Sequence, residues 1–219
     1  MKTFLTLDIK GGIAAIFVAV FLLVFGGGNG LFFLALMFAF LVASALATRF
    51  GKEVKKKLGV YDKSRGWKNV LANGAVPCIA ALLYFLFAGS PSASSFAAAY
   101  VATIAGITAD KFGSEIGVID TNTRMLLTLR KARRGISGAV SLLGLVVSLI
   151  GAFIIAALAL AFGLLNVNTF AIVVASGFVG NLADSAFGYF ENKGIGNKYT
   201  SNVMCSLGAW VCCMLLLLY

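Results

Sequence analysis

The sequence predicts an all-α fold, a polytopic transmembrane helical bundle with about seven spans. The chain of 219 residues is 60% hydrophobic and only 12% charged, whereas soluble domains carry about a quarter charged residues. Apolar runs of about 18 to 25 residues recur along the whole length, and each is long enough to cross a hydrocarbon core of roughly 30 Å. No soluble domain fits between these runs, so we predict a single integral membrane domain over residues 1–219.

The predicted helices are separated by short connections of two kinds. The connections at residues 26–30, 90–94 and 164–167 contain no charged side chain. The others are rich in Lys and Arg, and the helices after them start with cap-type residues such as Asn, Gly, Ser and Thr. A second apolar run follows the first at once, so we expect a retained first helix and not a cleaved signal peptide. The predicted spans lie near residues 4–25, 31–48, 69–89, 95–117, 138–163, 168–190 and 201–219.

The distribution of charge predicts the orientation of the bundle. With seven spans, the 18 basic residues all fall at or near one membrane face. The positive-inside rule makes that face cytoplasmic, with the N-terminus inside and the C-terminus outside, so we expect an integral protein of the cell membrane. The net charge of +10 on this face attracts anions. Lysines such as Lys55, Lys56 and Lys57 have a simpler explanation, since they can merely fix topology and contact lipid headgroups.

The segment richest in reactive groups is residues 108–117, near the inner end of the fourth predicted span. Asp110, Ser114 and Glu115 lie in the last turns of an apolar helix, where ionisable groups are costly unless paired or bound to a metal. Asp110 and Ser114 share a helix face, but Glu115 lies about 140° away from Asp110 around the helix. The two carboxylates reach one ion only if the helix unwinds locally or another helix supplies a third ligand.

A candidate for that third ligand lies near the inner end of the sixth predicted span. Asn181, Asp184 and Gly188 fall on one helix face, and the glycine permits close helix packing. A buried hydrogen bond or an ion pair with Lys111 is the structural alternative for Asp184.

Candidate phosphate-binding groups surround these acids. The N-termini of the third, fifth and seventh spans offer free N–H groups and a positive dipole end, although capping alone also explains their Ser and Asn residues. Carboxylates beside basic side chains suit Mg²⁺ and polyphosphate chemistry. The absence of histidine, of paired cysteines and of a G-x-x-x-x-G-K-[ST] motif argues against histidine catalysis, a zinc site and a phosphate loop. The candidate nucleotide- and phosphate-binding residues are Lys63, Arg65, Lys68, Asn73, Ser114, Lys131, Ser137, Asn181 and Asn202.

Residues 60–210 resemble the phytyl-phosphate kinases of vitamin E biosynthesis and their archaeal, bacterial and animal relatives. Residues 109–117 are similar to the family signature A-D-T-x-x-S-E-I-G, with Lys111 in place of the usual threonine. Asn73-Gly74, residues 135–144, Asp184 with Gly188, and Asn202 occur in the family's order. Arg133-Arg134 precede Gly135 where a P-P-G-T-x-G-like stretch is common. More faintly, the chain resembles CTP-dependent polyprenol kinases.

The resemblance implies an enzyme that transfers the γ-phosphoryl group of a nucleotide, CTP by analogy, to phytyl or geranylgeranyl phosphate in the bilayer. Asp110, Glu115 and Asp184 would be catalytic and would hold Mg²⁺, while the Asn, Ser, Lys and Arg candidates would bind the phosphates. The acceptor phosphate has its second pKa near 6, so at neutral pH it is largely ionised and needs no strong general base. Membrane lipids are expected partners, and nucleic acid is not.

Several other functions stay open at the level of sequence. A lipid cytidylyltransferase would use the same substrates and metal but release pyrophosphate, and a polyprenol kinase would phosphorylate an alcohol. An ion-coupled transporter would place acids near the bilayer midplane with access from both faces. A purely structural membrane protein would tolerate neutral substitutions of its acids.

Overall fold

The computed structural model describes residues 6–62 and 64–218, and it confirms the prediction of a helical fold. Within these ranges a two-stranded hairpin is the only sheet. The elements are α1 (Ile9–Phe25), the 3-10 turn η1 (Gly27–Asn29), α2 (Gly30–Arg49), α3 (Lys52–Lys57), α4 (Trp67–Leu86), α5 (Ala93–Gly117), β1 (Thr123–Met125), β2 (Ala139–Ser141), α6 (Leu142–Ala161), α7 (Val167–Glu191) and α8 (Lys198–Leu216).

Several of these helices have the properties of membrane spans. Among the described residues, α2 with η1, α4, α6, α7 and α8 are long and apolar enough to cross a membrane. Helix α1 is apolar but has 17 residues, and α5 carries many small and polar residues. Each of the seven predicted spans falls on one long helix. The number of membrane crossings and the side of the membrane on which each terminus lies stay predictions.

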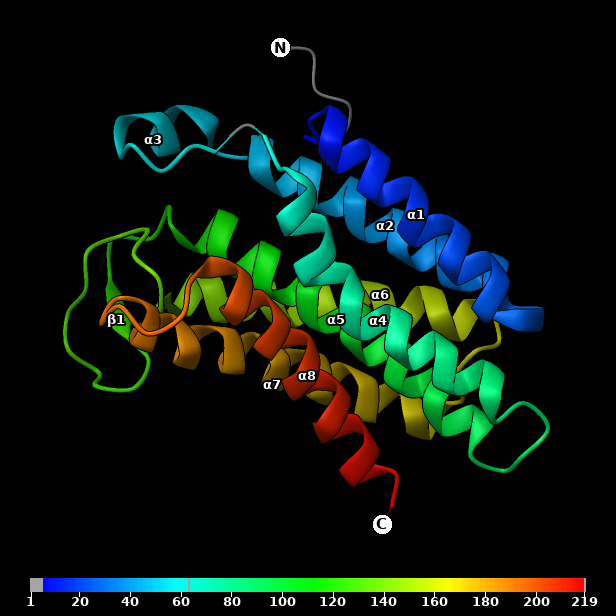
Figure 1. The fold of residues 1–219 in the computed structure, drawn as a ribbon. Helices are drawn as coiled ribbons and strands as arrows, with labels where there is room; N and C mark the ends of the chain where they lie inside the picture. Colours follow the sequence, from blue (N-terminus) through cyan, green and yellow to red (C-terminus); the bar gives the residue numbers. More distant parts are fainter. Residues whose placement is uncertain (1–5, 63, 219) are drawn as a thin grey trace.

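Helix α5 lies at the centre of the bundle and contacts α2, α4, α6, α7 and α8 (Figure 1). Every residue from 97 to 111 is buried. Small side chains let its neighbours approach closely: a Cβ added at Gly106 would lie 3.0 Å from Cβ of Ala209 in α8. One added at Gly177 in α7 would lie 2.8 Å from Cβ of Ala105. Such small-residue contacts are typical of helix packing in membranes.

The connection between α5 and α6 contains the hairpin, which was not predicted from the sequence. The fifth helix was expected to begin near residue 138, but α6 begins at Leu142. Gly135 and Gly138 have φ of 82° and 78°, left-handed values that interrupt a right-handed helix. Ser141 provides the N-cap, since its Oγ accepts a hydrogen bond from the backbone N of Gly144 at 3.1 Å. Ser137 therefore lies in the loop before β2 and caps nothing.

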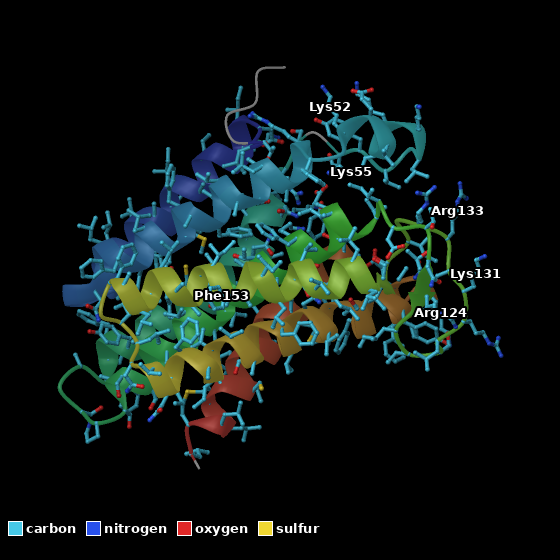
Figure 2. All side chains as sticks on the ribbon, turned by 180° about the vertical axis from the view of Figure 1, so that it is seen from behind. Lys52, Lys55, Arg124, Lys131, Arg133 and Phe153 are labelled. Carbon is cyan, nitrogen blue, oxygen red and sulfur yellow. The ribbon has the colours of Figure 1, made fainter. Side chains whose placement is uncertain are left out.

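Charged side chains gather at one end of the bundle. Figure 2 shows Lys52, Lys55, Arg124, Lys131 and Arg133 at the end formed by α3 and the hairpin, whereas Phe153 lies further along the helices. The C-terminal end of α5 and the start of α6 lie at this same end, because the hairpin connects them (Figure 1). The polar site described next is built there.

Candidate functional site

A cavity of about 430 Å³ lies at the charged end of the bundle. Its walls come from the last turns of α5 and α7, the loop and strand before α6, and the first turns of α6 and α8. The predicted site residues that line it are Asp110, Ser114, Glu115, Ser137, Asn181, Asp184 and Asn202.

Asp110 of α5 and Asp184 of α7, here called the acid pair, face each other in this cavity. Asp110 is only 6% exposed, and the two carboxyl groups are close enough to interact electrostatically. Lys111 forms a salt bridge with this pair, with its Nζ 3.3 Å from Oδ2 of Asp110. Within the described chain, the buried Oδ1 of Asp184 has no hydrogen-bond partner. When both carboxyl groups are ionised their charges repel, and a bound cation would balance them.

Amide side chains from two helices surround the acid pair. Nδ2 of Asn181 donates to Oγ of Ser148 at 3.2 Å, and its Oδ1 would lie 3.1 Å from a Cβ added at Gly113 of α5. Asn202 is buried in the first turns of α8, and its Nδ2 lacks a partner among the residues described. The site thus offers an unused acceptor on Asp184 and an unused donor on Asn202, a combination that suits a metal-bound anion.

Glu115 lies in a different environment, which we call the Glu115 cluster: Glu115, Lys55, Arg65 and Thr48. Nζ of Lys55 lies 2.9 Å from Oε2, and Nη2 of Arg65 lies 2.6 Å from Oε1. The hydroxyl of Thr48 donates to Oε1 at 3.1 Å. Both carboxylate oxygens are therefore already paired.

The structure does not bring Glu115 to the acid pair. Helix α5 continues without interruption to Gly117, so Glu115 stays about 140° from Asp110 around the helix. Its glycines do not unwind it but serve close packing, since a Cβ on Gly117 would lie 2.6 Å from Cα of Gly144. Within the described ranges there is no group of three or more His, Cys, Asp or Glu side chains that could hold a metal. The predicted site of three carboxylates is thus reduced to two.

Several predicted phosphate-binding residues lie elsewhere. Arg65 is held by Glu115, and Asn73 is buried in α4 beside a second cavity. Lys68 is exposed with its Nζ 5.7 Å from the centre of a neighbouring indole ring. Lys131 is exposed on the hairpin. Lys63 lies outside the described residues.

The helix N-termini offer fewer free N–H groups for phosphate binding than the sequence suggested. The N-terminal N–H groups of α8 are capped by Asn197, whose Oδ1 accepts from the backbone N of Tyr199 at 2.9 Å and of Thr200 at 3.3 Å. Helix α6 is capped by Ser141. The start of α4 does not line the cavity of the acid pair. Asn202 reaches this cavity through its position in α8 and not as a cap.

Sequence reasoning missed three ionisable residues of the cavity, Asp62, Glu191 and Lys198. Glu191 follows Asp184 by seven residues, a spacing that puts the two on one helix face and could have been noticed. Its Oε2 accepts from Oγ of Ser137 at 3.0 Å and of Ser201 at 3.4 Å. Lys198 begins α8 at the cavity rim, with Nζ 4.0 Å from Oδ2 of Asp62. Its place after a capping asparagine gave a weaker signal.

Comparison with known sequences shows which proteins this chain is similar to. The sequence profile described as integral membrane protein DUF92 matches residues 3–204. An uncharacterized membrane protein of Methanocaldococcus jannaschii is 33% identical over 206 residues, covering 92% of this chain and 82% of that protein.

Two plant proteins are more distant relatives. The chloroplastic Protein VTE6 of Arabidopsis thaliana is 28% identical over 172 residues, which cover 76% of this chain but only 52% of VTE6. Protein PGR of the same plant is 26% identical over 208 residues, 84% of this chain and 71% of PGR. No solved structure matches the chain.

Proposed function

The chain belongs to the integral membrane protein family DUF92, and on this premise we propose that it is a prenyl-phosphate kinase. In this proposal it transfers the γ-phosphoryl group of a nucleoside triphosphate, CTP by the family resemblance, to an isoprenoid monophosphate such as phytyl or geranylgeranyl phosphate. One observation carries the proposal: the acid pair, with a carboxylate oxygen that has no partner in the described part of the chain, lies in a cavity that Lys55, Lys111 and Lys198 also line.

The acid pair fits a magnesium ion that arrives with the nucleotide. Mg²⁺ is usually bound by one or two carboxylates together with substrate phosphates, and not by a cage made of protein alone. Asp110 and Asp184 would hold it, and the unpaired Oδ1 of Asp184 is the oxygen with free capacity. When bound, Mg²⁺ neutralises charge on the transferring phosphates. Glu115 does not fit as a ligand, because Lys55 and Arg65 occupy its oxygens.

The protein's own groups would act by positioning and charge stabilisation. An oxygen of the acceptor phosphate attacks the γ-phosphorus while the bond from that phosphorus to the bridging oxygen breaks. The nucleoside diphosphate leaves with the electron pair, and the product is a prenyl diphosphate. The attacking oxygen is already ionised, so no proton needs removal. Lys111 and Lys198 would neutralise the two anionic substrates, and the free Nδ2 of Asn202 would orient a phosphate oxygen. Asn181 would contribute its carbonyl oxygen, which suits the metal shell and not a phosphate oxygen.

The cavity also suits an acceptor with an apolar tail. Val118, Ile136, Val140 and Leu145 contribute to its lining beside the polar groups. A prenyl phosphate would place its headgroup at the acid pair and its first carbons against these side chains. The charged residues that line this cavity lie toward one end of the bundle, which favours a one-sided enzyme site over a transport path with access from both faces.

The test uses purified, detergent-solubilised protein with Mg²⁺, γ-labelled CTP and either geranylgeranyl or phytyl monophosphate. Label should enter a prenyl diphosphate with release of CDP, and Asp110→Asn should abolish the transfer. Release of pyrophosphate would indicate the cytidylyltransferase instead. Folded protein that transfers label from no nucleotide to any prenyl phosphate or alcohol would contradict the proposal.

A further inference from the structure

A second cavity, of about 130 Å³, lies between α1, α2 and α4. It shares no lining residue with the cavity of the acid pair. Most of its wall is apolar, with Val18 and Ala19 from α1 and Met37 and Phe38 from α2. Its volume is close to that of engineered apolar cavities of roughly 150 Å³, which stay free of water and bind benzene. It can therefore hold a hydrocarbon segment of a few carbon atoms.

The end of this cavity that lies toward the Glu115 cluster is polar and incompletely satisfied. Arg65 and Asn73 line it and are only 7% and 4% exposed. Nδ2 of Asn73 donates to the backbone O of Asn69 at 3.0 Å and to its Oδ1 at 3.1 Å. These two contacts fix the amide orientation, so Oδ1 of Asn73 is the free atom. Among the described residues, neither this Oδ1 nor Nε of Arg65 has a hydrogen-bond partner.

The two unpaired atoms define the headgroup that would satisfy them. Nε of Arg65 is a donor and Oδ1 of Asn73 is an acceptor, and a hydroxyl group can accept from the first and donate to the second. An ionised phosphate has no hydrogen to give to Asn73, and Nη2 of Arg65 is already bound to Glu115 at 2.6 Å. A pure hydrocarbon would leave both buried polar atoms unpaired, which is costly.

From these features we infer that the second cavity binds a single-chain lipid alcohol. The hydroxyl lies between Arg65 and Asn73, and the first carbons of the chain fill the apolar part. The rest of the chain leaves between α1 and α2, where Phe38 lines the cavity and is 53% exposed on the outer surface. This places the headgroup toward the charged end of the bundle and the chain toward the bilayer core. The inference does not depend on the proposed phosphoryl transfer.

The binding test needs no nucleotide, so its outcome is independent of kinase activity. The full chain in phosphatidylcholine nanodiscs is titrated with tritiated farnesol and with the matching hydrocarbon. We expect saturable binding of one alcohol per chain, preferred about tenfold over the hydrocarbon, since one good hydrogen bond corresponds to about that factor. Asn73→Leu should remove this preference while the hydrocarbon still binds.

A space-filling pair of variants tests the location. Ala19→Phe fills the cavity and should weaken alcohol binding at least about tenfold. The matched control is Ala14→Phe, on the same helix but not in the cavity lining, and it should bind as the wild type does. Equal binding by both variants would overturn the inference, as would equal affinity of the wild type for alcohol and hydrocarbon. The absence of saturable binding would mean that the cavity holds water or nothing.

A measurement on the wild type covers the case in which the variants do not fold. Farnesol that carries a photoreactive diazirine in its chain is irradiated in the nanodiscs, and the labelled residues are identified by mass spectrometry. Label on Met37 or Phe38 is expected. Label confined to other helices would overturn the proposed site.

Discussion

The acid pair and Glu115 line the same cavity but differ in how their charge is balanced. Among the described residues, the acid pair forms one salt bridge, from Lys111 to Asp110, and Oδ1 of Asp184 has no partner. Glu115, five residues further along α5, is bound by two cations and a hydroxyl. A carboxylate that binds a metal or substrate must keep an oxygen free, whereas one that supports the fold is saturated by its neighbours. The same helix thus carries one acid of each kind.

The Glu115 cluster also connects the N-terminal part of the molecule to the central helix. Lys55 belongs to α3, Thr48 to α2 and Arg65 to the segment before α4. The backbone around Arg65 is further fixed, because its N donates to O of Thr6 at 2.8 Å and its O accepts from N of Asp8 at 3.2 Å. Removing Glu115 would therefore loosen three elements at once, whereas removing a member of the acid pair would loosen none.

The largest effect is expected for Asp184→Asn on phosphoryl transfer. Loss of a metal-binding carboxylate at the transferring phosphate should lower kcat by about 10³-fold, the size found when a key electrostatic group is removed. Stability should stay equal or rise slightly, because one of two facing negative charges is removed. The measurement compares initial rates with the thermal unfolding midpoint of the same preparation.

Two controls accompany that prediction. Asp110→Asn should behave in the same way, and removal of divalent cations by EDTA should abolish the activity of the wild type until Mg²⁺ is restored. An Asp184→Asn enzyme that keeps its activity within a few-fold of the wild type would show that the acid pair is not the metal site.

Glu115→Gln, unlike Asp184→Asn, should lower the stability of the protein more than its intrinsic activity. It leaves Lys55 and Arg65 buried without their shared anion, and breaking a buried ion pair from one side costs about 3 kcal/mol. We expect a clear fall in the thermal unfolding midpoint, with any loss of activity following from the loss of folded protein. The control is Glu53→Gln, which removes an exposed pair with Lys56 and should change stability by less than about 1 kcal/mol. Unchanged stability with lost activity in Glu115→Gln would instead give Glu115 a catalytic role.

The sequence predicted that Asp110 and Asp184 come together, but it did not predict the partners of Glu115. Helical geometry alone places Asp110 and Glu115 on different faces, and the position of Asp184 near the inner end of another helix made it a candidate partner. The partners of Glu115 could not be foreseen, because Lys55 and Arg65 come from short loops and a six-residue helix whose docking depends on tertiary packing. Lysines there have the pattern of a solvated, topology-determining loop.

The start of α6 after the hairpin and the location of Asn73 are two further features that the sequence did not predict. The start of α6 was placed near residue 138 because apolar residues continue from β2 into the helix, and only the extended backbone of the N-cap Ser141 separates the two. Asn73 was assigned to phosphate binding from its place near a helix start. The structure places it in the second cavity, since the direction in which α4 packs decides which cavity its side chains line.

A smaller effect is expected at the cavity rim. Lys198→Gln removes a half-exposed cation that faces the anionic substrates, so KM for the nucleotide should rise about tenfold while kcat changes little. Lys193→Gln is the matched control, because this lysine lies in the connection just before α8 but outside the cavity. Its kinetics should equal those of the wild type. Equal shifts in both variants would indicate general charge attraction and not a contact in the site.

The smallest expected effect concerns two serines that line the cavity of the acid pair, one that supports the fold and one that does not. Ser141 caps α6 and also donates to O of Gly117, the last residue of α5, at 3.0 Å. Ser141→Ala should therefore lower stability by about 1 kcal/mol, the usual value for a helix cap. Ser137 caps nothing, and Ser137→Ala should stay within about 0.5 kcal/mol. Thermal unfolding of the two variants side by side checks this difference. If Ser137→Ala were the more destabilised, its bond to Glu191 would belong with the saturated, structural contacts around Glu115 and not with the open site of the acid pair.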